Sequence, residues 1–356
     1  MISINNNNVT IGSWDYTQSK KPYIIAEIGV NHEGSLSLAK ELIDQAKEGG
    51  ANAAKFQTYK AESLAIKNSP SYWDLSKEKI KNQQDLFKKY DKLNLDDYYD
   101  LYKYCNKKNI DFLSTPFDLD SVKYFSNFMN FFKIASADIT SLPLLREIAI
   151  TNKPVLLSTG ASSLEEIKFA VEAIKSIGNK KIVLLHCILN YPTKNADANL
   201  SRILFLKSKF PECGIGYSDH TLPDLNMSIL TTSYLLGAKV IEKHFTHNKN
   251  LPGNDHYHAM DMHDLKIFNQ QIDNIIEIVG HQESEFVKNE KVSRVNARRS
   301  IVANTNLKKG SVLNDNNLTF KRPGFGISPI EWDNIIGKKL NKDIVKDHVL
   351  KWDDIE

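Results

Sequence analysis

The sequence predicts an α/β protein in which a (β/α)8 barrel is followed by a small β-rich domain. From about residue 23 to about residue 281, short apolar runs that end in polar residues alternate with stretches of helical periodicity. Such runs are typical of parallel strands covered by helices. After residue 280 the chain changes to short β-prone pieces separated by turns. These observations indicate two domains of different architecture.

Eight apolar runs supply the expected strands, and eight βα units in this length favour a closed barrel over an open sheet. The runs are Tyr23–Gly29, Ala53–Thr58, Phe112–Phe117, Phe131–Ser136, Pro154–Gly160, Ile182–Cys187, Gly214–Asp219 and Val240–Thr246. Between them, Leu36–Lys47 has helical spacing and is followed by Gly49-Gly50, a helix stop signal. Ser162-Ser163 precedes two glutamates and predicts a helix N-cap.

Three further segments are interpreted from their composition. The segment 60–90 is too long for a simple connection, and it suits a substrate lid and a surface excursion equally well. The opening Ile2–Gly12 is interpreted as a hairpin at the bottom of the barrel. We expect a barrel domain over 1–282, a charged linker over 283–296, and a β-rich domain over 297–356. A domain of that size is marginal alone, so we expect it to pack on a partner surface.

Composition excludes several classes of protein. The 356 residues carry a formal net charge of only +3, with lysines scattered among acids, which argues against a nucleic-acid binder. Cys105, Cys187 and Cys213 form no metal or redox spacing, and they suit reduced thiols in a cytoplasmic protein. We find no apolar stretch that approaches the ~18 residues of a membrane-spanning helix and no signal-peptide core.

Polar residues end all eight expected strands, where barrels of this type carry their active sites. Any one of them has a structural explanation: a strand histidine is usually a hydrogen-bonded core residue, and Glu27 could neutralise Lys55 or Lys133. Together they are harder to dismiss, because buried lysines are costly unless a ligand or carboxylate meets them. His220 and His244 follow neighbouring strands and could share one divalent ion. The pattern predicts a site for an anion and a metal.

The motifs resemble those of the N-acetylneuraminate (sialic acid) synthase family over nearly the whole chain. They are IIAEIGVNHEGS, AAKFQTY, FLSTPFD, FKIAS, LLSTG, LLHC, YPT, GYSDHT, IEKHFT and the tail RRSIVA, KKG and KRPGFGISP. The resemblance implies a (β/α)8 TIM barrel with a C-terminal antifreeze-like (SAF) domain. It further implies a domain-swapped homodimer that joins phosphoenolpyruvate to N-acetylmannosamine or a related amino sugar, giving a nonulosonate and phosphate.

Roles for individual residues follow from the resemblance alone. Glu27, Lys55, Lys133 and Asp255 become catalytic candidates, and His220 and His244 become ligands of a divalent ion, Mn2+ or Mg2+. The implied substrate-binding residues are Thr115, Ser136, Ser158, Asn190, Tyr191, Ser218 and Arg322. Lys55, Lys133 and the serines match the phosphoenolpyruvate-binding set, whereas Glu27, Tyr191 and Asp255 match groups that face the sugar. Arg322, in KRPG, matches an arginine delivered to the partner subunit's active site.

Two departures from the family pattern lie near the expected sugar pocket. The chain reads Cys187-Ile188-Leu189-Asn190-Tyr191 where the family has an asparagine or serine closer to the cysteine, and Gly253-Asn254-Asp255-His256 where it has G-P-D-H. We therefore expect an acceptor other than plain N-acetylmannosamine, such as a diacetamido hexose. The neighbouring His256, His258 and His263 are expected to be solvated loop histidines rather than metal ligands.

Three other functions compete with this interpretation. A condensation with a sugar phosphate, of the sialic acid 9-phosphate synthase type, would need an additional basic cluster for the second phosphate. A metal-dependent pyruvate aldolase would need fewer phosphate ligands. A non-catalytic carbohydrate-binding protein would not need Glu27, Lys55, Lys133, His220 and His244, all of which are present.

Overall fold

The structure, a computed structural model, describes residues 9–253, 255–280 and 288–356. The chain divides into two compact units, Met1–Val279 and Gly280–Glu356, each with its own hydrophobic core. The first is built around an eight-stranded sheet and the second around a two-stranded antiparallel sheet. The expected boundary between residues 282 and 283 lies outside the described residues.

Eight parallel strands form the centre of the first unit. They are β3 (Tyr23–Gly29), β4 (Ala53–Thr58), β5 (Asp111–Pro116), β6 (Phe132–Ile134), β7 (Val155–Ser158), β8 (Ile182–Cys187), β9 (Gly214–Asp219) and β10 (Val240–His244). Their order is β5-β4-β3-β10-β9-β8-β7-β6, so the last strand pairs with the first. The two ends of that order, β5 and β6, also lie side by side. The expected (β/α)8 barrel is thereby confirmed.

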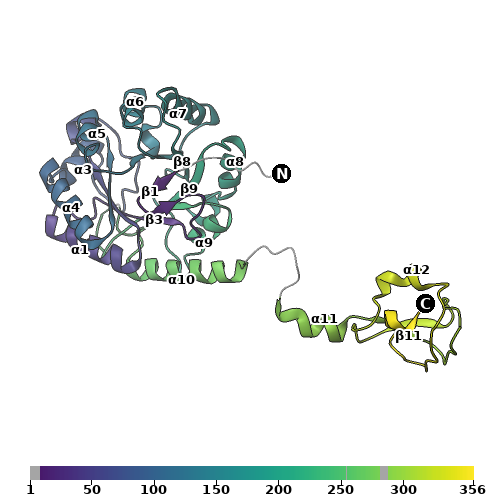
Figure 1. The fold of residues 1–356 in the computed structure, drawn as a ribbon. Coiled ribbons are helices and arrows are strands. Elements are labelled where there is room, and N and C mark those ends of the chain that lie inside the picture. Colours follow the sequence, from purple (N-terminus) through teal and green to yellow (C-terminus); the bar gives the residue numbers. More distant parts are fainter. Residues whose placement is uncertain (1–8, 254, 281–287) are drawn as a thin grey trace. The chain divides into compact units, whose positions relative to one another are not determined.

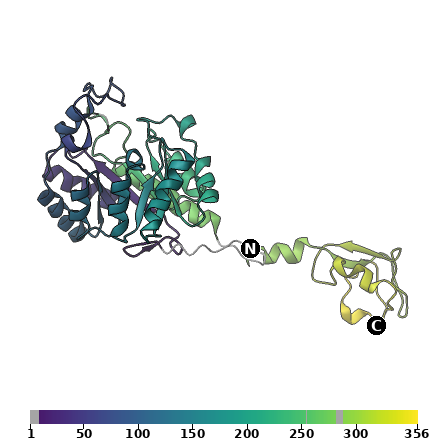
Figure 2. The same ribbon diagram turned by 90° about the horizontal axis from the view of Figure 1, so that it is seen from above.

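Helices surround these strands in both views (Figure 1 and Figure 2). They are α1 (Leu36–Gly49), α2 (Ala61–Leu64), α3 (Gln83–Tyr90), α4 (Leu95–Lys108), α5 (Leu119–Phe125), α6 (Leu142–Ile150), α7 (Leu164–Ser176), α8 (Ser201–Lys209), α9 (Ser228–Leu235) and α10 (Met262–Val279). Local signals fix their ends. α1 ends at Gly50, whose φ of 94° suits glycine. α7 begins at Ser163, which forms a capping box with Glu166. None of the described helices is both long and apolar enough to cross a bilayer.

A short hairpin covers the amino-terminal end of the barrel, and its described part extends past Gly12, where the expected hairpin ends. Its strands are β1 (Thr10–Ile11) and β2 (Trp14–Asp15), and residues 2–8 of the expected hairpin lie outside the described residues. Just after β2, the Tyr16 hydroxyl accepts a hydrogen bond of 2.8 Å from the Ile215 amide near the start of β9. The polar residues that end the strands lie at the opposite, carboxyl end of the barrel.

The second unit is small and β-rich, as the sequence predicts. β11 (Ser300–Ala303) pairs with β12 (Leu318–Lys321), and α12 (Trp332–Ile335) follows. Its buried core contains Ile301, Leu313, Leu318, Ile335, Leu340 and Leu350 among others. The described part of the expected linker 283–296 contains most of a short helix, α11 (Lys291–Ala297). The side chains of this helix are exposed.

Candidate functional site

Strand register places the acidic, basic and imidazole candidates at the same height in the barrel. Glu27 on β3 is aligned with His244 on β10 and with Lys55 on β4. One step below, Glu242 on β10 is aligned with Ser218 on β9. Side chains of alternate residues in barrel strands point to the interior in layers. The fold therefore brings together residues that are more than 200 positions apart in the chain.

An inner cavity opens at this carboxyl end, with about 590 Å³ of empty space when the part open to solvent is included. Its lining includes ten residues that the sequence singled out as site candidates: Glu27, Lys55, Thr115, Lys133, Ser136, Ser158, Tyr191, Ser218, His220 and His244. Cys187, Leu189 and Glu242 also contribute. The lysines and hydroxyl residues expected to bind an anion therefore line the same cavity as the two histidines.

Two lysines and two glutamates form a buried charge network in this cavity. Glu27 forms an ion pair with Lys55 and accepts a hydrogen bond of 2.8 Å from the side-chain amide of Gln57. Glu242 lies between the ammonium groups, with one carboxylate oxygen 3.7 Å from Lys55 Nζ and the other 3.7 Å from Lys133 Nζ. Each charged side chain thus has an opposite partner, as burial requires.

The network sets unequal pKa values for the two carboxyl groups. Burial raises the pKa of Glu27 to about 7, because desolvation and the negative charge of Glu242 outweigh the ion pair with Lys55. Burial also acts to raise the pKa of Glu242. The positive charges of Lys133 and Lys55 outweigh that effect, so the pKa of Glu242 is lowered. Burial also lowers the pKa of Lys133, despite the nearby Glu242. Near neutral pH, Glu27 is therefore able to gain or lose a proton while Glu242 stays ionised.

Four hydroxyl groups complete the polar lining of the inner cavity. Thr115 accepts a hydrogen bond of 3.2 Å from Lys55 Nζ, and Ser218 donates one of 3.0 Å to Glu242. Ser136 accepts one of 2.9 Å from the Gly160 amide. Ser158 is buried, and its hydroxyl has no hydrogen-bond partner among the described residues. A buried hydroxyl without a partner, in a cavity that also contains two ammonium groups, suits an anionic ligand.

A close backbone approach explains the glycine at the end of β7. A Cβ atom at Gly160 would lie 2.8 Å from Ser136 Oγ and 3.2 Å from the Leu189 amide nitrogen. The first distance is shorter than real Cβ contacts, and at the second the backbone of the loop after β8 would have to shift by a few tenths of an ångström. Glycine therefore lets the loop after β7 pack against the loop after β8 without such shifts.

An outer cavity adjoins the inner one, with about 600 Å³ of empty space when the part open to solvent is included. Four residues line both cavities: Gln57, Tyr72, Tyr191 and His244. Its wall is largely aromatic, with Tyr59, Tyr72, Trp73, Phe87, Tyr90 and Tyr191. The segment 60–90, including α3, contributes several of these side chains, so it lines a cavity rather than only covering surface. Asp255 and His256 lie on the same wall. An aromatic wall with a few polar groups is typical of a site for a small polar ligand.

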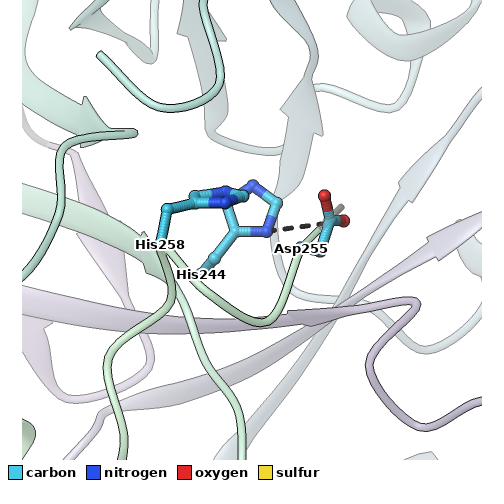
Figure 3. Close-up of side chains that lie close together, drawn as sticks. All are labelled: His244, Asp255 and His258. Atoms are coloured by element: carbon cyan, nitrogen blue, oxygen red, sulfur yellow. Dashed lines mark ion pairs between the residues drawn. The ribbon is translucent and has the colours of Figure 1, made fainter. Parts of the chain in front are cut away.

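Histidines and a carboxylate meet where the two cavities join. His244, Asp255 and His258 offer ligand atoms that all lie within 4.8 Å of one another, and His244 Nδ1 is 3.6 Å from Asp255 Oδ2 (Figure 3). His220 lies nearby, with its ring centroid 5.4 Å from that of His244. Burial and the neighbouring His258 and His220 hold the pKa of His244 well below its usual range. A neutral imidazole is the form that binds metals.

Three predicted positions differ from expectation. Asn190 is exposed and lines neither cavity, because the loop after β8 turns Leu189 and Tyr191 inward instead. His256 and His258 are buried, so describing them as solvated was wrong; only His263 is exposed. The physical reason is that the loop folds back on β10, where the Met260 amide bonds the His244 carbonyl at 2.8 Å.

Two further positions that the sequence singled out are not among the described residues of the barrel unit. Arg322 is exposed and follows β12 in the second unit. Asn254 lies outside the described residues.

Sequence reasoning missed Glu242 and His258 as members of the site. Glu242 stands two residues before His244 on the same strand, so the alternation of side chains already indicated that both point inward. His258 gave no such signal, because it lies in a loop without periodicity. Cys187 at the end of β8, with Sγ 3.8 Å from His220 Nδ1, was seen only as a reduced thiol.

Fold and site together define a (β/α)8-barrel enzyme with an anion-type cavity beside a candidate metal site. Residues 42–284 match the NeuB family, and residues 298–356 match the SAF domain. The N,N'-diacetyllegionaminic acid synthases of Legionella pneumophila and Campylobacter jejuni are each 39% identical to this chain. The alignments cover 94% and 93% of this chain, and 94% and 99% of the respective relatives.

A solved N-acetylneuraminic acid (sialic acid) synthetase of Leptospira borgpetersenii is 34% identical, with a TM-score of 0.69. The match covers 80% of this chain and 94% of that one. The chain belongs to the NeuB family of nonulosonate synthases and carries a C-terminal SAF domain.

Proposed function

We propose that this protein condenses phosphoenolpyruvate with an N-acetylated amino-sugar aldehyde, giving a sialic-acid-type nonulosonate and inorganic phosphate. The observation that carries the proposal is the pair of joined cavities. The inner one holds buried Lys55 and Lys133, and the outer one has an aromatic wall. His244 lines both at their junction. Two substrates of different chemistry would therefore meet beside a candidate metal site.

The inner cavity suits phosphoenolpyruvate because that molecule carries two anionic groups on three carbons. The ammonium groups of Lys55 and Lys133 offer charge, and Ser136, Ser158 and Ser218 offer hydroxyl donors. An anion that enters here would attract the ammonium groups that now face Glu242. Preorganised donors in a space that excludes water fix the orientation of a bound substrate.

The residues at the junction fit a divalent ion. His220 Nδ1 lies 2.7 Å from the Ile188 carbonyl, which can only accept, so in the neutral ring this nitrogen carries the proton and Nε2 keeps its lone pair. His244 and the carboxylate of Asp255 add a nitrogen and an oxygen donor. Mn2+ or Mg2+ held by these side chains would polarise the aldehyde oxygen as a Lewis acid.

The chemical step then depends on where the side chains hold the two substrates. Tyr191 and Asp255 would orient the open-chain sugar so that its aldehyde carbon faces C3 of phosphoenolpyruvate. A carbon–carbon bond forms between these atoms, and positive charge develops at C2, where ionised Glu242 or Glu27 would stabilise it. Water adds to C2 and its proton passes to Glu27, whose pKa of about 7 suits a proton acceptor. The aldehyde oxygen, which becomes an alkoxide when the carbon–carbon bond forms, takes up a proton to give a hydroxyl group. Cleavage of the bond between C2 and the bridging oxygen then releases phosphate, and the C2 hydroxyl loses its proton to leave a 2-keto acid.

The acceptor is proposed to be a diacetamido hexose rather than a sugar phosphate. The described residues that line the outer cavity include no lysine or arginine. A second phosphate would need cations in that place. Both of the legionaminic acid synthases compared here are more similar to this chain than the sialic acid synthetase of known structure.

The SAF domain is proposed to act across a homodimer. We propose a barrel domain over 1–282, a linker over 283–296 and the SAF domain over 297–356, with Arg322 serving the partner subunit's active site. Arg322 is exposed on the second unit, which is the condition for reaching another surface. The small hydrophobic core of that unit agrees with a domain that gains stability from a partner surface.

The experiment is release of inorganic phosphate from phosphoenolpyruvate in the presence of Mn2+, with a panel of acceptors. The panel contains N-acetylmannosamine, its 6-phosphate, and the 2,4-diacetamido hexoses. We expect release with a diacetamido hexose, and its loss on chelation. Faster turnover of the 6-phosphate would favour the sugar-phosphate alternative. No release with any acceptor, together with no binding of phosphoenolpyruvate, would refute the proposal.

A further inference from the structure

We propose that His258 is a third imidazole ligand of the divalent ion, beyond the pair His220 and His244, and that it makes the site selective for transition metals. The inference extends the ion requirement of the proposed function. It starts from the position of a residue that the sequence analysis interpreted as a solvated loop histidine rather than a metal ligand. His258 is fully buried, and it lies in the loop between β10 and α10.

The loop that carries His258 is held in place at successive residues. Asn31 donates hydrogen bonds from its side-chain amide to the carbonyls of Phe245 (3.0 Å) and Asp255 (3.2 Å). The hydroxyl of Tyr257 donates to the Tyr191 carbonyl at 2.9 Å. The next turn is bound to the end of β10 through the Met260 amide. Because the backbone on both sides of His258 is fixed, its imidazole is preorganised rather than placed by chance.

The separations between the three rings fit one shared ion. For metal–nitrogen distances of about 2.1 Å, two imidazoles on one ion have ring centroids roughly 4.5 Å apart at a right angle and roughly 6.4 Å apart when opposite. The observed separations are 4.8 Å for His244 and His258, 5.4 Å for His220 and His244, and 6.2 Å for His220 and His258. All three pairs fall within that interval.

The ligand atoms themselves are also close enough. Two donors at about 2.1 Å from an ion are at most about 4.2 Å apart. The donor atoms of His244, Asp255 and His258 lie within 4.8 Å of one another, so a shift of well under an ångström would close the site (Figure 3). Rotamer adjustments of that size are common on binding. His220 lies outside that group of three, so its ring would have to turn further toward the ion to supply the third nitrogen.

The composition of this ligand set decides which ion it prefers. Three imidazoles and one carboxylate form a nitrogen-rich site, which suits Mn2+, Co2+ or Zn2+. Mg2+ prefers oxygen ligands and gives up water reluctantly. Without His258 the set would hold two nitrogens and be more tolerant of Mg2+. His258 therefore contributes to selectivity as well as to affinity.

The test measures ion binding without turnover. The full chain, stripped with a chelator, is titrated with Co2+, Mn2+ and Mg2+ by calorimetry, and Co2+ is also followed by its visible absorption. We expect one Co2+ per chain at the site and at least tenfold tighter binding of Co2+ and Mn2+ than of Mg2+. His258→Gln should weaken Co2+ and Mn2+ binding by about 10- to 100-fold, by analogy with the loss of other metal-site residues. The binding of Mg2+ should change little.

His263→Ala is the matched control, because His263 is exposed in the first turn of α10. It should bind all three ions as the unaltered chain does. Circular dichroism and the melting temperature check that each variant folds. A folded His258→Gln variant with unchanged Co2+ affinity would overturn the proposal.

A second measurement covers the case in which His258→Gln does not fold. X-ray absorption fine structure of the unaltered chain loaded with Co2+ counts imidazole ligands directly. We expect three, and a count of two would overturn the proposal. A chain that binds Co2+ through three imidazoles and yet releases no phosphate would refute the proposed function while leaving this inference intact.

Discussion

Replacing Glu242 by glutamine should destabilise the barrel and strengthen its affinity for anions at the same time. Glu242 lies 3.7 Å from each of two buried ammonium groups, those of Lys55 and Lys133. At an effective dielectric constant of about 20, each attraction is worth about 4.5 kcal/mol. The desolvation of the carboxylate and its repulsion of Glu27 offset much of this sum. Removal of one member of a buried pair costs about 3–5 kcal/mol, which is the expected loss in the free energy of unfolding.

The assay is calorimetric unfolding of Glu242→Gln with and without inorganic phosphate. Because the variant leaves net positive charge in the inner cavity, phosphate should raise its melting temperature more than that of the unaltered chain. Glu212→Gln is the control, since Glu212 makes a partly exposed ion pair with Lys175 at 3.0 Å. It should cost no more than about 1 kcal/mol. A Glu242→Gln variant as stable as this control, with no greater response to phosphate, would refute the charge network.

Four further predictions use other parts of the structure. The pKa of Glu27 is about 7 in the folded state against an ordinary 4.5, so the folded state binds this proton more tightly than the unfolded state does. The free energy of unfolding should therefore decrease as the pH rises from about 4.5 to 7. Glu27→Gln should remove that decrease, as measured by denaturant titrations at several pH values. Arg322→Ala should reduce phosphate release at least tenfold while the barrel's melting temperature stays unchanged; near-normal rates would remove the cross-subunit role. Chelation should abolish phosphate release, and added Mn2+ should restore it; full activity in the metal-free chain would contradict the ion requirement. Ser163→Ala should lower the stability of the barrel by about 0.5–2 kcal/mol through loss of the α7 N-cap, without altering the affinity for phosphoenolpyruvate.

The barrel could be predicted closely from the sequence because its strands are buried on both faces. A strand such as Ile182–Cys187 is apolar almost throughout, and the polar His186 next to its last residue indicates that the strand is ending. The hairpin at the amino end was harder to predict. Thr10–Ile11 and Trp14–Asp15 are two-residue strands, too short for any period to show.

The residues of the candidate site also differ in how well the sequence predicts them. Residues on strands, such as Lys55 and Lys133, follow from the alternation of side chains, since every second position faces the interior. Residues in loops do not follow, because no period fixes them: Asn190 turned outward, and His258 is buried by backbone contacts made at Met260. The charge balance at Glu242 is a tertiary effect that depends on two other strands.

The most direct test of the central claim is the path of water in the reaction. The chain is incubated in water enriched in oxygen-18 with phosphoenolpyruvate, Mn2+ and the preferred diacetamido hexose, and both products are analysed by mass spectrometry. If the carbon–carbon bond forms and water adds at C2, a nonulosonate accumulates and the released phosphate contains no label. Labelled phosphate without a nonulosonate would show simple hydrolysis at phosphorus and contradict the account.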